Sequence, residues 1–274
     1  MKPSVFEELK IRWVILKANT MFSVKESLAY SLNNWGGLAS TTVYMVTYLV
    51  FLSAIFGRVK TLAGYNYSEI LLLTLVSQFN FYLAWVWSIR NLDQLGEDVK
   101  TGKLDLILTK PLPALWYVTI QKVNLFMLLF EMWPATLPLI YLLVKNADFH
   151  ISLWGTFLGV LTFVFGSIAI HCFQFVLTLV SFWTGEYKGL NGLSYQIAFF
   201  GDTTPLEAYP NRIMSLGLTV IPFLIHTALT TSLILGKTTD VRWVFLSFFV
   251  MMTFIIIKIK MWNLALRQYS SASS

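Results

Sequence analysis

The stretch EDVKTGKLDLILTKPLPALW, residues 97–116, lies between two long apolar segments and is the most charged part of the chain. The whole chain has 274 residues, of which 56% are hydrophobic and only 12% are charged. Its mean hydropathy is +0.65. A soluble domain carries roughly 25% charged residues. The composition therefore predicts an all-α membrane protein in which residues 97–116 form a charged loop between two spans.

Six apolar segments on either side of this loop are expected to cross the bilayer as helices, because a helix pairs every backbone group within itself. The predicted spans are residues 37–57, 68–87, 117–144, 151–183, 188–201 and 241–257. Pro134 and Pro138 are expected to kink the third span. The fifth span is short, and the interrupted apolar region that follows it, residues 201–235, predicts a re-entrant helical hairpin.

The N-terminal segment, residues 1–34, forms a predicted domain of its own, and residues 35–274 form the six-span domain. Its apolar residues recur at helical spacing among charged ones, which predicts an amphipathic helix in the membrane interface. These residues are Phe6, Leu9, Trp13 and Leu16. We expect the chain to turn into the membrane at residues 33–37, which include Gly36 and Gly37.

The distribution of basic residues predicts the orientation. With the N-terminus inside and six crossings, most of the 20 Lys and Arg residues fall on the cytoplasmic side. They gather in the N-terminal segment, in the loop around residues 97–116, and in a basic tail that begins at Lys258. Both termini are therefore predicted to be cytoplasmic. The net charge is +6, but the basic residues flank the spans, so the charge does not indicate nucleic acid as a partner.

Residues 97–116 combine an apolar face with charges of alternating sign. The pattern predicts a short surface helix over about residues 95–109, interrupted at Gly102 and ended by Pro111. Two interpretations remain open at this point. The segment is either a solvated loop on lipid headgroups or a docking surface for a cytoplasmic protein.

Residues 97–113 resemble the first cytoplasmic loop of permeases in type-2 ATP-binding-cassette (ABC) exporters. The shared pattern is an acidic residue, Gly-Lys, a Leu-rich stretch and a basic-Pro-Leu end. Two further regions are similar to that family: GDTTPL at residues 201–206 with Tyr209-Pro210 and Ile221-Pro222-Phe223, and WNLALRQYS at residues 262–270. Tyr209 stands where Phe is usual, and Ala265 where Gly is usual. With the spans and the N-terminal helix, the resemblance covers nearly the whole chain.

The resemblance implies a bacterial exporter in the cell (inner) membrane. A second permease, identical or different, would complete a path, and separate ABC ATPase subunits would carry ATP and Mg. Residues 95–109 would be the coupling helix, and lipids would surround the spans. The implied ATPase-docking residues are Asp98, Lys100, Lys103, Leu104, Asp105, Ile107 and Leu108. The implied path residues are Thr74, Ser77, Gln78 and Asn80, and the hairpin would form an external gate with Gly201, Pro205, Pro210 and Pro222.

Other features of the sequence bear on whether the chain carries out chemistry of its own. Gly236-Lys237-Thr238 matches the end of a phosphate-binding loop, but Thr231 occupies the position of the first glycine, so we expect a helix end there. No nucleophile–base arrangement, paired catalytic carboxylates or metal-ligand spacing is present in the sequence, which predicts a protein that is not an enzyme and binds no cofactor directly. The single cysteine, Cys172, excludes an internal disulfide.

Ionisable residues at membrane depth leave an alternative function open, because such groups are costly there and usually face a cavity or the protein interior. Glu131, His171 and His226 are of this kind. A proton-coupled secondary transporter using Glu131 or His171 is the alternative to the exporter. Each of the three could equally make a helix-packing hydrogen bond, as could the polar residues assigned to the path. Gly155 and Gly159 form a small-xxx-small pattern for close helix approach, within one subunit or between two.

Overall fold

A computed structural model describes residues 5–29, 31–146, 148 and 150–269. In this part of the chain the regular elements are helices, apart from an isolated bridge between Leu62 and Tyr65. They are, in chain order, α1 (Val5–Ala29), α2 (Ser31–Phe56), α3 (Tyr67–Trp87), α4 (Ile89–Lys100), α5 (Leu104–Leu108), α6 (Ala114–Ile120), the π-helix η1 (Met127–Glu131), α7 (Met132–Lys145), α8 (Leu153–Thr178), α9 (Ser181–Thr184), α10 (Lys188–Thr203), the 3-10 helix η2 (Leu206–Ala208), α11 (Asn211–Thr219), the π-helix η3 (Ile225–Leu229), α12 (Thr230–Ile234) and α13 (Arg242–Gln268).

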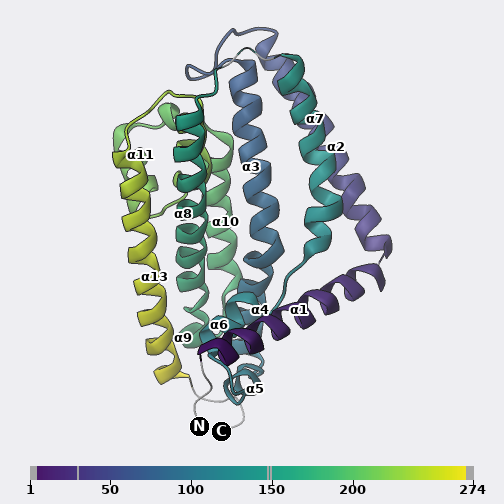
Figure 1. The fold of residues 1–274 in the computed structure, drawn as a ribbon, viewed down its shortest axis with the longest axis vertical. Coiled ribbons are helices and arrows are strands. Elements are labelled where there is room, and N and C mark those ends of the chain that lie inside the picture. The colour runs from purple at the N-terminus through teal and green to yellow at the C-terminus, as the bar shows by residue number, and fades with distance from the viewer. Residues whose placement is uncertain (1–4, 30, 147, 149, 270–274) are drawn as a thin grey trace.

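The long helices lie side by side and run the length of the molecule, whereas α4, α5, α6 and α9 gather at its lower end (Figure 1). Five helical stretches of the described residues are long and apolar enough to cross a membrane. They are Asn34–Phe56, Tyr67–Lys100, Met127–Lys145, Leu153–Thr184 and Arg242–Gln268. The predicted fifth span corresponds to α10, which has 16 residues and is not among the five. At a rise of 1.5 Å per residue, α10 is about 24 Å long, which is less than the hydrocarbon thickness of about 30 Å.

The beginning of α3 is fixed by its own sequence. The Asn66 side chain accepts a hydrogen bond from the Glu69 backbone N–H (2.9 Å), and the Glu69 carboxylate accepts one from the Asn66 N–H (2.8 Å). This reciprocal pair is a capping box, which satisfies backbone donors that the first helical turn leaves free. Such caps contribute about 1 kcal/mol. The second span therefore begins at Tyr67, one residue before its predicted start.

The predicted third span, residues 117–144, begins too early. The chain forms α6, leaves helical geometry at residues 121–124, and only then enters the membrane-length stretch Met127–Lys145. The Asn91 amide explains the break, because it donates to the Lys122 carbonyl and accepts from the Lys122 N–H, both at 2.8 Å. The Asn124 N–H is taken by the Val86 carbonyl at 2.8 Å. These backbone groups are satisfied by α3 and α4, so they do not continue a helix.

The two prolines of this span lie in α7, directly after the π-helical turn η1. Pro134 has no N–H to offer to the carbonyl four residues earlier, Phe130. Wider π-type turns occur where the regular hydrogen-bond ladder is interrupted. In η1 the Met132 N–H bonds the Met127 carbonyl, five residues back.

The last span continues beyond its predicted end at residue 257, because α13 runs without interruption to Gln268. Lys258 was expected to begin a basic tail, and this expectation is wrong. Lys258 is buried in the helix, with its ammonium hydrogen-bonded to Thr119 Oγ1 at 3.0 Å. A basic residue marks the end of a span only when nothing inside the protein satisfies its charge and donors.

The N-terminal segment is helical in α1, which runs obliquely across the lower part of the molecule (Figure 1). Its predicted apolar residues Phe6, Leu9 and Trp13 are exposed, so the described part of the chain leaves this face uncovered. The predicted turn at residues 33–37 is wrong, because α2 already begins at Ser31 and includes these residues.

The region after α10 folds back on itself. Glycines of α8 show in which direction the second half of this region runs. A Cβ added to Gly166 would meet the His226 backbone at 2.6 Å, and one added to Gly155 would meet the Leu233 carbonyl oxygen at 2.4 Å. The segment from η3 to α12 is therefore antiparallel to α8. Together with α11, which precedes the turn at Pro222, it forms a pair of short helical segments. The glycine pattern of α8 thus serves packing within this chain.

Candidate functional site

The charged loop of the sequence consists of two short helices. α4 follows α3 almost directly and ends at Lys100, and α5 begins at Leu104. Gly102 has φ 73° between them, a left-handed conformation that costs a glycine little and other residues more. The interruption predicted at Gly102 is thus present, and it divides residues 95–109 into two helical pieces that can present different faces.

The predicted docking residues divide into buried and exposed ones. Leu104 and Ile107 are only 0% and 6% exposed and belong to an apolar cluster with Val118 and Trp262. Asp98 is also buried. The residues on the outer side of α5 and its flanks are exposed, and these include Lys103, Leu106, Leu108, Thr109 and Lys110. Leu106, which the sequence analysis did not assign to docking, is 68% exposed.

Contacts within α4 and with the segment that follows α9 hold α4 in place. The Asp98 carboxylate accepts a hydrogen bond from Gln94 Nε2 at 2.7 Å, one turn earlier. Lys100 Nζ lies 2.6 Å from Glu186 Oε1 after α9, and this contact holds the pKa of Glu186 below its ordinary value. Gly96 packs so closely on the Tyr187 ring that an added Cβ would lie 2.3 Å from it.

The C-terminal end of α13 contacts the same helices. Burial, together with the nearby Asp105 carboxylate, raises the pKa of Tyr269 to about 12. Aromatic rings continue this contact from Tyr269 to Phe182 and from Phe182 to Trp262, with centroids 5.6 and 6.1 Å apart. The helix pair α4–α5 is therefore packed against the ends of α8, α9 and α13. Gln94, Glu186 and Tyr187 were missed from the sequence, where a glycine inside a helix at Gly96 was the available signal.

Two cavities lie beside α3 at membrane depth. The α8 cavity, between α3, α8 and α10, has a volume of about 360 Å³ and is lined by Asn80. The α2 cavity, between α2, α3 and α10, has a volume of about 320 Å³ and is lined by Thr74, Ser77 and Gln78. The four polar residues predicted for a path thus lie at cavity walls, three at one and one at the other.

Some of these polar residues also hold helices together. Thr74 Oγ1 lies 3.1 Å from Tyr48 Oη of α2, and it donates to the Ile70 carbonyl at 2.8 Å. Asn80 Oδ1 accepts a hydrogen bond from Ser167 of α8 at 3.4 Å. Cavity lining and helix packing therefore coincide at these positions.

The buried histidines have different surroundings. His171 Nδ1 lies 2.6 Å from Ser88 Oγ, and its Nε2 lies 3.2 Å from Lys258 Nζ, so both ring nitrogens have partners. His226 is fully buried, with Nε2 3.3 Å from Asp202 Oδ1. The contacts of His171 join helices distant in the sequence, as helix-packing hydrogen bonds do.

Glu131 lies near Gly37 at a third cavity, the α1 cavity, of about 1080 Å³. This cavity is lined by residues of α1, α2, α3 and η1. The carboxylate is half-buried, and an added Cβ at Gly37 would lie 3.0 Å from its Oε1. Glycine at this position therefore lets α2 approach the acidic side chain of η1.

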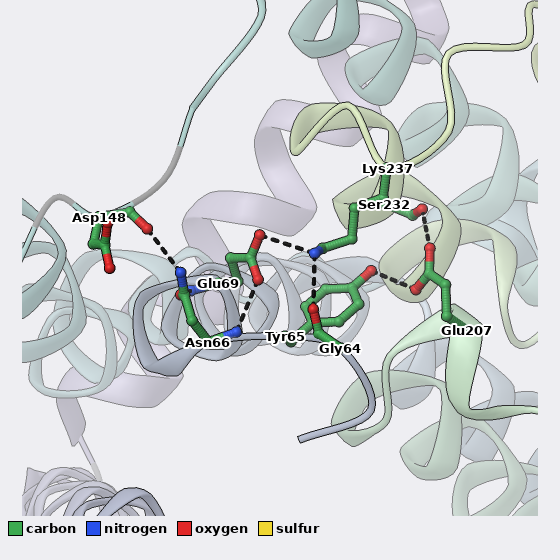
Figure 2. Close-up of polar contacts among 8 residues, drawn as sticks. All are labelled: Gly64, Tyr65, Asn66, Glu69, Asp148, Glu207, Ser232 and Lys237. Carbon is green, nitrogen blue, oxygen red and sulfur yellow. Dashed lines mark hydrogen bonds and ion pairs between the residues drawn. The ribbon is translucent and has the colours of Figure 1, made fainter. Parts of the chain in front are cut away.

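The opposite end of the molecule carries a polar cluster centred on Lys237, shown in Figure 2. Lys237 Nζ lies 2.9 Å from Glu69 Oε1, donates to the Gly64 carbonyl at 3.1 Å, and sits 4.3 Å from the centroid of the Tyr65 ring. Tyr65 Oη in turn donates to Glu207 Oε2 at 2.6 Å. The Lys237 charge is thus neutralised within the chain.

The four predicted gate residues lie along the folded-back region. Gly201 contacts the turn at Pro222, because a Cβ there would lie 2.0 Å from the Phe223 carbonyl oxygen. Pro205 and Pro210 directly precede η2 and α11, where a proline does not interrupt a helix. The four residues thus fix the breaks and the close contact that give the region its shape.

A sequence model of the family described as ABC-2 family transporter protein matches residues 42–273. The chain belongs to this family. This ABC-2 permease is a multi-pass membrane protein and a component of membrane transport, and its family implies partnership with an ABC ATPase. No match was found among curated proteins or among solved structures.

Proposed function

We propose that this ABC-2 permease is the membrane-spanning subunit of a bacterial ABC exporter in the cell membrane, with both termini cytoplasmic. A second permease completes the translocation path, and separate ATPase subunits bind and hydrolyse ATP with Mg. The observation that carries the proposal is the α4–α5 surface. It is exposed on its outer side, it is packed on its inner side against the ends of several long helices, and it lies at the end of the molecule where α1 begins and α13 ends (Figure 1).

The ATPase contacts are proposed on the outer side of α5. Leu106 and Leu108 provide the apolar anchor, since burying a leucine side chain contributes about 1.5–3 kcal/mol. Lys103, Lys100 and Asp105 add charged contacts of at most about 1 kcal/mol each. The buried Asp98, Leu104 and Ile107 support this surface from inside, and they are not themselves available for contact in this conformation.

Movement of the ATPases would reach the membrane through this packing. α3 and α4 form a nearly continuous helical stretch, Tyr67–Lys100, which carries the four polar residues predicted for the path. A displacement of α5 would therefore be passed to the walls of the proposed path, Thr74, Ser77, Gln78 and Asn80. The hairpin of residues 201–235 is proposed to dip into the membrane and close the external end of the path.

The alternative function, a proton-coupled secondary transporter, receives less support. Both nitrogens of His171 have partners, and the family is one that works with an ATPase.

The test is recovery of an ATPase with the purified full-length permease. Leu106→Asp is expected to lower the recovered vanadate-sensitive ATP hydrolysis by about tenfold, because the variant removes an apolar anchor and places a charge in the joint. Leu62→Asp is the matched control, since Leu62 is exposed in the loop between α2 and α3 at the opposite end. Equal recovery from wild type and Leu106→Asp would contradict the proposed docking surface.

A further inference from the structure

We propose that the α8 and α2 cavities together bind a hydrophobic organic cation, with the Asp202 carboxylate as its counter-charge. The inference rests on the proposed function, in which these cavities belong to the translocation path, and it adds the class of substrate. It starts from the observation that the two cavities share three lining residues, Phe81, Phe199 and Asp202.

The size and chemistry of the cavities suit a ligand of moderate size. Binding pockets for small molecules are roughly 300–1,000 Å³ and mostly apolar, with a few polar groups that fix orientation. Both cavities fall at the lower end of this range, and they adjoin at their shared residues. Aromatic rings line them, among them Trp85 and Phe163 in the α8 cavity and Tyr44 and Tyr48 in the α2 cavity. The faces of such rings attract cations and stack with flat apolar groups.

Asp202 supplies the charge that selects a cation. Its side chain is only 12% exposed, yet it lines both cavities. Thr227 Oγ1 donates to Asp202 Oδ1 at 2.6 Å, and His226 Nε2 lies 3.3 Å from the same oxygen. Both of these contacts are made to Oδ1. A carboxylate so far removed from water is costly unless it is paired, and a bound cation would pair it.

The nearby basic side chain of Lys258 does not neutralise the Asp202 carboxylate. Lys258 lines neither cavity, because it lies behind His171 and over the Phe175 ring at 4.1 Å. Among the described residues that line the two cavities, Asp202 is the single carboxylate, and the other ionisable groups besides tyrosine are His171 and His226. The cavity walls thus present one acidic group among aromatic rings.

Two ions of the same shape and opposite charge provide the test. Tetraphenylphosphonium is the cationic probe and tetraphenylborate its anionic match. Binding of each is measured by equilibrium dialysis with the purified full-length permease in detergent, and empty micelles give the background. We expect saturable binding of tetraphenylphosphonium, weakened about tenfold or more by Asp202→Asn and retained in Asp202→Glu.

Asp240→Asn is the matched control, because it makes the same chemical change at a carboxylate that pairs with Arg242 outside both cavities. If Asp202→Asn fails to fold, Phe199→Ala tests the same site, with Phe245→Ala as its control on an exposed position of α13. Phe199→Ala should weaken tetraphenylphosphonium binding, and Phe245→Ala should not.

Two results would overturn the inference: tetraphenylborate binding as tightly as tetraphenylphosphonium, or unchanged tetraphenylphosphonium binding in both Asp202→Asn and Phe199→Ala. Recovery of the ATPase is measured on the same samples. If tetraphenylphosphonium does not bind but the ATPase is still recovered, the cation site is disproved and the proposed exporter function is not. Loss of the ATPase from the wild-type chain would defeat the exporter, while binding of the cation would still be measurable.

Discussion

Lys237 illustrates how one residue can be assigned from its contacts. It stands in Gly236-Lys237-Thr238, which ends like a phosphate-binding loop, yet its ammonium is occupied by Glu69 and the Gly64 carbonyl. α12 ends at Ile234, and Gly236 follows with φ 67°, so the expected helix end is confirmed. The missing first glycine was readable from the sequence. The partner was not, because Glu69 begins a different helix.

At this position we expect Lys237→Met to destabilise the chain by about 1–3 kcal/mol, because the partly buried Glu69 carboxylate loses its charged partner. The measurement is the midpoint of thermal unfolding in detergent. Lys60→Met is the matched control, since Lys60 is exposed in the loop between α2 and α3. An unfolding midpoint unchanged in Lys237→Met would contradict the structural role of this lysine. So would ATP binding by the isolated wild-type permease that is lost in Lys237→Met.

Among the elements, α8 owes its packing to glycine. Gly155, Gly159 and Gly166 let the segment from η3 to α12 approach at backbone distance. Between helices in a membrane, where burial of apolar surface gives little gain, such close contact is a main source of stability. The sequence revealed the small-residue pattern. It did not reveal whether the partner helix belongs to the same chain or to a second subunit, because a helix of either could pack closely against these glycines.

Alanine at two helical glycines separates close packing from helix propensity. Gly166→Ala should destabilise the protein by about 1–3 kcal/mol, because its Cβ would meet the His226 backbone, which cannot move aside cheaply. Gly192→Ala in α10 has open space around the Cβ and should be neutral or stabilising by up to about 1 kcal/mol. Thermal unfolding of both variants distinguishes the two effects, and equal shifts would argue against the packing role.

The lengths of several membrane helices were predictable. A helix that crosses the hydrocarbon layer needs a long apolar run, and such a run can be read directly from the sequence. The second and fourth predicted spans differ little from α3 and from α8 with α9. The errors have another origin. Lys258 and the break at residues 121–124 depend on Thr119, His171 and Asn91, which lie on other helices. In the candidate site, the exposed Lys100 and Lys103 were recognised, but the burial of Asp98 was not. The inward direction of Leu104 and Ile107 was also missed, because Gly102 changes the direction of the chain.

For the whole molecule, the structure separates two ends of different character. α4 and α5 lie at one end, near the beginning of α1 and the end of α13, and the loop between α2 and α3 lies at the other (Figure 1). If the long helices cross a membrane, these two ends face opposite compartments. Cys172 is buried, so the native thiol gives little background for a labelling experiment.

We expect Lys60→Cys to react with a membrane-impermeant maleimide in intact spheroplasts, and Lys103→Cys to react only after the membrane is permeabilised. Both positions are exposed in the fold, so the membrane decides access. Wild type serves as the control for Cys172. Labelling of both variants from the same side would contradict the proposed topology, and the reverse pattern would place the α4–α5 surface outside the cell.

Asn91 has a consequence for motion. Its side-chain amide accepts a hydrogen bond from the Lys122 backbone N–H and donates one to the Lys122 carbonyl, as a residue of a neighbouring β-strand would. Residues 121–124, before η1, are not helical, but these hydrogen bonds hold them in place. A tilt of the second membrane helix would therefore carry the entry of the third with it for as long as these hydrogen bonds hold.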